Sequence, residues 1–226
     1  MPERQGTGVA DAEVEWAPLA HQFDDAAQQR AAATLGMWTF LATEILFFGG
    51  MFTGYAVYRT AMPAAFGAGS RHLDFGLGTL NTAVLLLSSL TMALAVHAAE
   101  NGGRVRLALC LAGTMGLGAL FLAVKFFEYA SKFREHLVPG PAFAAPPGSP
   151  PHLEIFFSFY FVMTGMHTLH MIVGEGILLT LLLRAARGGF EGGRCGPVVI
   201  SGLYWHFVDV VWIFLYPLLY LAVVRT

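Results

Sequence analysis

The chain contains 226 residues, of which 56% are apolar and 12% are charged, and its mean hydropathy is +0.60. A water-soluble domain of this size rarely has such a composition, so we expect a membrane protein. The formal charge is −2, and the 13 Lys and Arg residues are scattered between apolar runs, which excludes a basic face for nucleic acid. Cys110 and Cys195 predict neither a CxxC site nor a disulfide framework.

The first thirty residues are polar and acidic, and they lack the basic start, short apolar core and cleavage site of a signal peptide. We predict that residues 1–30 form an extramembrane N-terminal arm. From Asp24 the sequence DDAAQQRAAA has good helix-forming composition, so the first span is expected to extend outward into solvent.

Five stretches are long and apolar enough to cross the roughly 30 Å hydrocarbon core of a bilayer as helices. Their apolar residues are continuous rather than alternating, which excludes the strands of a closed β-barrel. The sequence therefore predicts an all-α fold in which residues 31–226 form one bundle of five transmembrane helices. The predicted spans are residues 35–58, 76–98, 105–127, 156–183 and 198–224, and the proline-rich stretch 137–152 is predicted to be an extramembrane loop.

The charges outside the spans favour an orientation with the N-terminus in the cytoplasm. The C-terminus and the 137–152 loop would then face the periplasm. The Lys and Arg residues placed inside are Arg4, Arg30, Arg104, Arg106, Arg184, Arg187 and Arg194, and those placed outside are Arg59, Arg71, Lys132, Arg134 and Arg225.

Helix association in a bilayer depends on close packing of small residues and on interhelical hydrogen bonds, because lipid tails are as apolar as leucine. Small residues recur at helical spacing in the third and first spans, and we expect both stripes to be contact faces. The stripes are Ala108, Ala112, Gly116, Ala119 and Ala123 in the third span, and Gly50 and Gly54 in the first.

Polar residues in the second and third spans predict further contacts. Asn81, Ser88 and Thr91 fall on one helical stripe, as expected of side chains that bond across to a neighbouring helix. Lys125 and Glu128 are three residues apart near the end of the third span, where they can pair or reach the membrane interface.

Four ionisable residues lie too deep to reach the interface easily: Glu44, Glu175, His206 and Asp209. A carboxylate costs about 2.5–3.5 kcal/mol at mid-membrane, so each acid is expected to be protonated, paired or facing protein. At 1.5 Å per residue, Glu44, Glu175 and His206 fall roughly 12–14 Å from the cytoplasmic boundary, with Asp209 about one turn deeper. The sequence therefore predicts a shared polar layer.

His206 and Asp209 lie at i and i+3 on one helix face, which favours a hydrogen-bonded structural pair, with proton handling as the alternative. Glu44 has no ionisable neighbour within its own span. It is expected to be a neutral or paired structural acid, with proton exchange as the alternative.

His167 and His170 also lie at i and i+3 on one face. No cysteine or carboxylate completes a ligand set on that face, so we favour hydrogen bonds to neighbouring helices or to a lipid headgroup over metal binding. The chain shows no nucleophile–base arrangement, phosphate-binding glycine loop or paired-carboxylate cleft. No catalytic residue is therefore predicted on this chain.

Five motifs, in chain order between about residues 35 and 220, resemble subunit III of the haem-copper oxidases. GMWTFLATEILFFGGMFTGYAVYR is similar to that family's helix with an intramembrane glutamate, matched here by Glu44. LGTLNTAVLLLSS resembles the next helix, FFEY the Glu-Tyr pair, TGMHTLHMIVG the two-histidine helix, and YWHFVDVVWIFLY the most distinctive segment.

The resemblance implies a five-helix form of this subunit, as in the quinol-oxidase and nitric-oxide-reductase-associated branches, in the bacterial inner membrane. A cytochrome c oxidase is the favoured complex. Its implied role is non-catalytic. It would pack on catalytic subunit I among the other oxidase subunits, hold structural phospholipid, and support stability and proton uptake during oxygen reduction. Haem and copper would belong to the partner subunits of this proton-translocating complex. Arg184 would stand where the family places a lipid-headgroup arginine.

The sequence departs from the family pattern at two positions. The family's glutamate before the last motif falls on Val199, and Glu175 stands where a small hydroxyl or aliphatic residue is expected. We therefore hypothesise that Glu175 takes over the role of the missing acid.

Two other functions stay open at this point. One is the accessory subunit of a nitric oxide reductase, and the other is an autonomous proton or ion transporter that uses Glu44 and Glu175 as carriers. No span is broken by Gly or Pro at mid-membrane and no repeated half is visible, which argues against the transporter.

Overall fold

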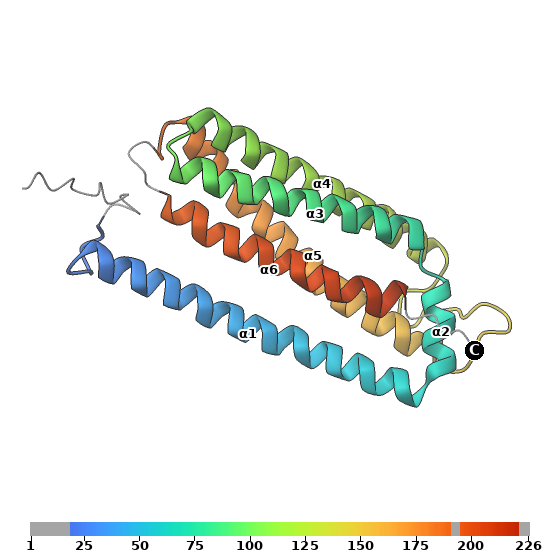
Figure 1. The fold of residues 1–226 in the computed structure, drawn as a ribbon. Coiled ribbons are helices and arrows are strands. Elements are labelled where there is room, and N and C mark those ends of the chain that lie inside the picture. Colours follow the sequence, from blue (N-terminus) through green and yellow to red (C-terminus); the bar gives the residue numbers. More distant parts are fainter. Residues whose placement is uncertain (1–18, 191–194, 222–226) are drawn as a thin grey trace, which may run out of the picture.

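A computed structural model describes residues 19–190 and 195–221, and within these ranges the chain forms six helices and no strand (Figure 1). All helices except α2 are long and apolar enough to span a membrane. The predicted all-α class with five spans is thereby confirmed. The helices are α1 (Ala26–Ala61), α2 (Pro63–Arg71), α3 (Phe75–Glu100), α4 (Arg104–Arg134), α5 (Leu153–Ala186) and α6 (Gly196–Tyr220).

Each long helix contains its predicted span, apart from the end of the fifth, whose residues 222–224 lie outside the described residues. Residues 1–18 of the predicted arm, with Arg4, and also Arg194 and Arg225, lie outside them too. The arm's last residues belong to α1, as the composition after Asp24 predicted. The Asp25 side chain accepts a hydrogen bond from the backbone N–H of Gln28 and so caps the start of this helix.

The bundle has two ends that are named here by their connections. The hairpin end carries the tight turn between α3 and α4, and the loop end carries α2 and the 137–152 loop. Gly102 has φ +68 and lies directly after the last residues of α3, in the left-handed region that glycine adopts without strain. The N–H groups of Gly102 and Gly103 donate to the carbonyls of Ala99 and Ala98, which closes the helix with a Schellman motif.

Helix α6 lies at the centre of the bundle, in contact with α1, α3 and α5, while α4 packs on α3 and α5. Its residues Trp205, Trp212 and Leu215 are at most 1% exposed. Figure 1 shows α1 along one edge of the bundle, with α3 and α4 along the opposite edge.

Helix α1 is attached to the bundle by few contacts. Of its 36 residues only Leu41, Phe48 and Tyr55 are buried. The Tyr55 hydroxyl donates a 2.6 Å hydrogen bond to the carbonyl of Leu218, next to Pro217 in the last turn of α6. Because the final carbonyls of a helix have no partner within it, this bond satisfies one of them and ties α1 to α6 at the loop end.

The short helix α2 was not predicted. Two glycines in the stretch PAAFGAGSR lower its intrinsic helix propensity. Packing overrides this propensity, since residues 65–70 are all buried. A Cβ atom on Gly69 would overlap the ring of Phe156 at the start of α5, so this position admits only glycine without rearrangement.

Most of the predicted small-residue stripe of α4 does not pack within the described chain, and only its first residue, Ala108, packs half-buried against the core. Ala112, Gly116, Ala119 and Ala123 are exposed, and among the described residues nothing would lie within 4 Å of a Cβ on Gly116. The core-facing side of α4 carries Thr114, Gly118, Phe121 and Lys125 instead. Four-residue spacing marks a stripe, but it does not say whether the stripe faces the bundle or lipid.

The other predicted contact residues lie on α1 and α3, and only some of them contact a neighbouring helix. On α1, a Cβ on Gly54 would meet the Phe159 ring at 3.3 Å, whereas Gly50 has no such neighbour within the described ranges. Two residues of the predicted polar stripe of α3, Ser88 and Thr91, do bond across helices. Ser88 Oγ donates to the Thr114 carbonyl at 3.3 Å, and Thr91 Oγ1 lies 2.8 Å from Thr114 Oγ1 on α4.

Candidate functional site

A carboxyl–histidine pair joins α1 to α5. Glu44 Oε2 lies 3.0 Å from His170 Nε2, and the two side chains are 18% and 14% exposed. His170 Nδ1 lies 2.8 Å from the Met166 carbonyl. Since a carbonyl only accepts, Nδ1 must carry a hydrogen. One further proton is then shared between Nε2 and Oε2, as either a carboxylic acid beside a neutral imidazole or a carboxylate beside an imidazolium.

The paired form of Glu44 was one of the predicted alternatives, but its partner was not foreseen. Glu44 and His170 are 126 positions apart in the chain. A single sequence gives no signal that would connect two such residues on different helices.

Three consecutive residues of α6 connect this pair to α3 and α5. The Tyr204 hydroxyl donates to the carbonyl of His170 at 2.9 Å, and Trp205 Nε1 donates to Ser88 Oγ at 3.0 Å. His206 Nδ1 lies 2.7 Å from Ser89 Oγ. Four helices, α1, α3, α5 and α6, meet here in a polar layer that consists of Glu44, Ser88, Ser89, His170, Glu175, Tyr204, Trp205 and His206.

The predicted hydrogen bond between His206 and Asp209 is wrong. His206 bonds to Ser89, and neither carboxyl oxygen of Asp209 has a hydrogen-bond partner among the described residues, although the Ser89 hydroxyl lies close by. Asp209 is only 3% exposed. Residues at i and i+3 share a helix face, but sharing a face does not ensure a hydrogen bond. The Ser89 hydroxyl on α3 lies within hydrogen-bond distance of His206, and the Asp209 carboxyl group on α6 does not bond to it.

Glu175 lies on the opposite side of α5 from Glu44. Its Oε1 is buried without a hydrogen-bond partner in the described ranges, and it occupies the space that a Cβ on Gly118 of α4 would need. The Trp205 ring covers the same glycine, at 2.9 Å from that Cβ position. Glu175 therefore belongs to the polar layer but does not meet Glu44 or His206 directly.

His167 and Asn81 are fully buried outside the polar layer, at 0% and 1% exposure. His167 Nε2 lies 3.1 Å from the Val208 carbonyl, which fixes its hydrogen on Nε2, and the ring packs between Phe121 and Trp212. This bond to a neighbouring helix is the use that the sequence favoured. For Asn81, the Oδ1 atom has no partner among the described residues.

A second polar cluster lies toward the loop end. The sequence predicted only its Lys125–Glu128 pair and not the tyrosines that join it. Lys125 Nζ lies 2.9 Å from Glu128 Oε2, and it donates to the hydroxyls of Tyr160 and Tyr220 at 3.2 and 3.1 Å. The Tyr220 hydroxyl donates to Glu128 Oε1 at 2.6 Å. Lys125 is 1% exposed, so it pairs inside the protein and does not reach the interface. This cluster fastens α4, α5 and α6 together.

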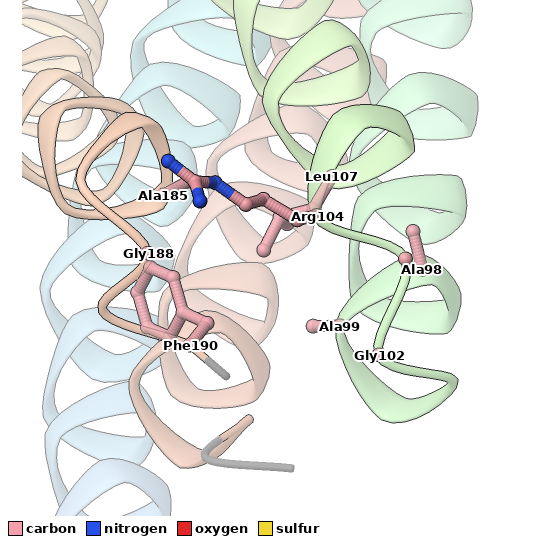
Figure 2. A pocket seen from close by; sticks show the side chains of 9 residues that line it. Ala98, Ala99, Gly102, Arg104, Leu107, Ala185, Gly188 and Phe190 are labelled. Atoms are coloured by element: carbon pink, nitrogen blue, oxygen red, sulfur yellow. The ribbon is translucent and has the colours of Figure 1, made fainter. Parts of the chain in front are cut away.

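At the hairpin end, Arg104 and Arg184 both interact within the chain. Arg104 Nη2 donates to the carbonyl of Ala186, one of the last carbonyls of α5, and Figure 2 shows this side chain reaching from the start of α4 toward Ala185 and Gly188. The cavity beside it has a volume of about 20 Å³, enough for one water molecule. Arg184 lies over the ring of Phe190, 5.4 Å from its centroid.

Metal ligation has no geometric basis in the part of the chain that the structure describes. Within residues 19–190 and 195–221, no group of three or more His, Cys, Asp or Glu side chains is placed to hold a metal ion. His167 and His170 both use a ring nitrogen to bond a backbone carbonyl.

These features define a multi-pass membrane protein with a helical bundle and a buried polar layer. Comparison with known proteins identifies the family. The model of the family "Cytochrome c oxidase subunit III" matches residues 20–223, so the chain belongs to this family. The resemblance drawn from the five motifs is confirmed.

Individual relatives agree with this family. Cytochrome c oxidase subunit 3 of Corynebacterium diphtheriae is 32% identical over 209 residues, which cover 87% of this chain and 95% of that protein. The Synechocystis protein of the same name is 34% identical over 187 residues, or 82% and 74% of the two chains. That of Thermostichus vulcanus is 29% identical over 220 residues, or 97% and 96%. All three relatives are named as subunit 3 of an oxidase, and they give no support to the reductase or transporter alternatives.

Proposed function

We propose that this chain packs on the catalytic subunit I of a bacterial haem-copper oxidase, holds phospholipid at its surface, and supports stability and proton uptake during oxygen reduction. Its N-terminus faces the cytoplasm and its C-terminus the periplasm. The observation that carries the proton part of this proposal is the 3.0 Å contact between Glu44 Oε2 and His170 Nε2. The pair joins the weakly packed helix α1 to α5 and remains partly exposed.

Helix α1 supports the docking part of the proposal. Its large apolar side chains remain exposed along most of its length, including Leu35 at 69%, Ile45 at 60% and Leu46 at 76%. A partner helix can cover these residues without disturbing the bundle. Because Glu44 lies on the same helix, the partner would come close to the carboxyl–histidine pair.

Glu44→Ala and Glu44→Gln separate a proton role from a structural one. The Gln side chain can still donate to a neutral His170 but has no acidic proton, while Ala removes the bond, a loss of roughly 0.6–1.7 kcal/mol in a membrane bundle. We expect both variants to assemble with normal haem content and to lose activity faster during turnover than the wild type. Normal sustained turnover of Glu44→Gln, with poor assembly of Glu44→Ala alone, would assign the pair a structural role only.

We further propose that Glu175 replaces the acid that is missing at Val199. Its unpartnered buried oxygen costs stability, about 1–3 kcal/mol for a group of this kind, which suggests that it is kept for function. Glu175→Leu is therefore expected to raise the unfolding temperature of the purified chain and to lower sustained turnover of the complex. If the Glu175→Gln complex assembled and turned over normally, this result would contradict the proposed role of Glu175.

A further inference from the structure

A groove of about 850 Å³ with a polar rim lies between α3 and α4 at the hairpin end. It is separate from the polar layer, and neither the fold nor the family comparison explains it. Six of the residues that line it are Leu94, His97, Asn101, Arg104, Arg106 and Leu109.

The rim of this groove is basic. Arg104, Arg106 and His97 supply its ionisable groups, and among the described residues that line it none is acidic. Glu100, the last residue of α3, does not line the groove. Burial raises the pKa of the Cys195 thiol at the start of α6, and the charge of Glu100 raises it further, which places Glu100 near that residue.

The walls of the groove are apolar and open to the bilayer. Leu94 and Leu109 are 48% and 67% exposed, and each lies about one turn further from the hairpin end than the rim residue of its own helix, His97 or Arg106. A ligand that fits both parts has an anionic head and an apolar chain. Free phosphate would use the rim and leave the walls uncovered.

We propose that this groove binds one anionic phospholipid. The headgroup phosphate lies at Arg106 and His97, with the Asn101 amide beside them, and an acyl chain lies along Leu94 and Leu109. Juxtamembrane arginines attract anionic lipid by about 1 kcal/mol each, which corresponds to about a fivefold change in affinity per arginine. A zwitterionic lipid gains much less because its own ammonium group repels the same rim.

This site gives a location to the lipid-holding part of the proposed function. Its test needs no oxidase activity, so its failure would leave the assembly and proton proposals untouched. The probe is phosphatidylglycerol with a photoreactive diazirine near the headgroup, added to the purified full-length chain in detergent. After illumination, labelled peptides are mapped by mass spectrometry.

The matched variants are Arg106→Gln in the groove and Arg71→Gln at the loop end, both checked for unchanged helix content and elution. We expect labels to concentrate on residues 94–110, to fall about fivefold in Arg106→Gln, and to persist in Arg71→Gln. Unlabelled phosphatidylglycerol should compete, whereas phosphatidylcholine and inorganic phosphate should not.

Three outcomes would overturn the proposal. They are labelling spread evenly over all lipid-facing helices, equal competition by phosphatidylcholine, and displacement of the probe by inorganic phosphate. If Arg106→Gln failed to fold, the peptide map and the competition series on the wild-type chain would still decide the matter.

Discussion

Lys125→Met is expected to destabilise the bundle by about 3–5 kcal/mol, the usual cost of breaking a buried ion pair by removing one partner. Methionine fills most of the space of lysine but leaves the carboxylate of Glu128, which is 4% exposed, without its cation. The hydroxyls of Tyr160 and Tyr220 lose the same donor. The expected result is a large fall in unfolding temperature, measured by circular dichroism of the purified chain in detergent.

Two controls make this prediction specific. Lys132→Met removes a similar i,i+3 pair in which Glu135 is 42% exposed, and such a pair contributes about 1 kcal/mol or less. The double variant Lys125→Met with Glu128→Gln removes both charges, so it should recover much of the lost stability. If Lys125→Met and Lys132→Met lowered stability equally, the buried cluster would not be the fastening point of α4, α5 and α6.

Gly174→Ala is expected to destabilise the contact between α5 and α6, although alanine normally stabilises a helix relative to glycine. A Cβ at this position would lie 2.9 Å from Trp205 Cζ3 and 3.2 Å from Tyr204 Cε1, and both rings belong to the polar layer. Rigid rings cannot yield as the end of a flexible side chain can. Overpacking of this kind costs about 1–3 kcal/mol, which exceeds the propensity gain of up to about 1 kcal/mol.

Gly176→Ala is the matched control two residues further along the same helix. Nothing in the described ranges lies within 4 Å of a Cβ there, so only the propensity gain remains. We expect Gly176→Ala to leave the unfolding temperature unchanged or raise it, while Gly174→Ala lowers it. A higher unfolding temperature for Gly174→Ala would show that Trp205 and Tyr204 do not press on α5 as described.

The number and approximate bounds of the spanning helices were predictable because about 20 apolar residues in a row have few structural alternatives in a bilayer. The N-terminal extension of α1 was predictable from the local composition after Asp24. The presence of deep ionisable residues was predictable as well, because each is conspicuous in an apolar run. All these signals are local in the sequence.

The partners of those residues were not predictable. Glu44 bonds to His170 and His206 to Ser89, and both bonds depend on how separate helices rotate against each other. Helix α2 escaped prediction because tertiary packing of Phe66 and Gly69 overrides the weak propensity of its sequence. The burial of Lys125 was not predictable either, because three of the aromatic rings around it belong to other helices, α5 and α6.

Purification through a tag on this chain, followed by a reduced-minus-oxidised spectrum, tests the central claim most directly. The claim is that the polypeptide serves an oxidase as a membrane subunit and binds no redox centre itself. The predicted result is a haem spectrum in the intact complex that disappears from the chain once the other subunits are stripped away. A haem or copper signal that stays with the isolated chain, or a chain that never co-purifies with haem, would contradict it.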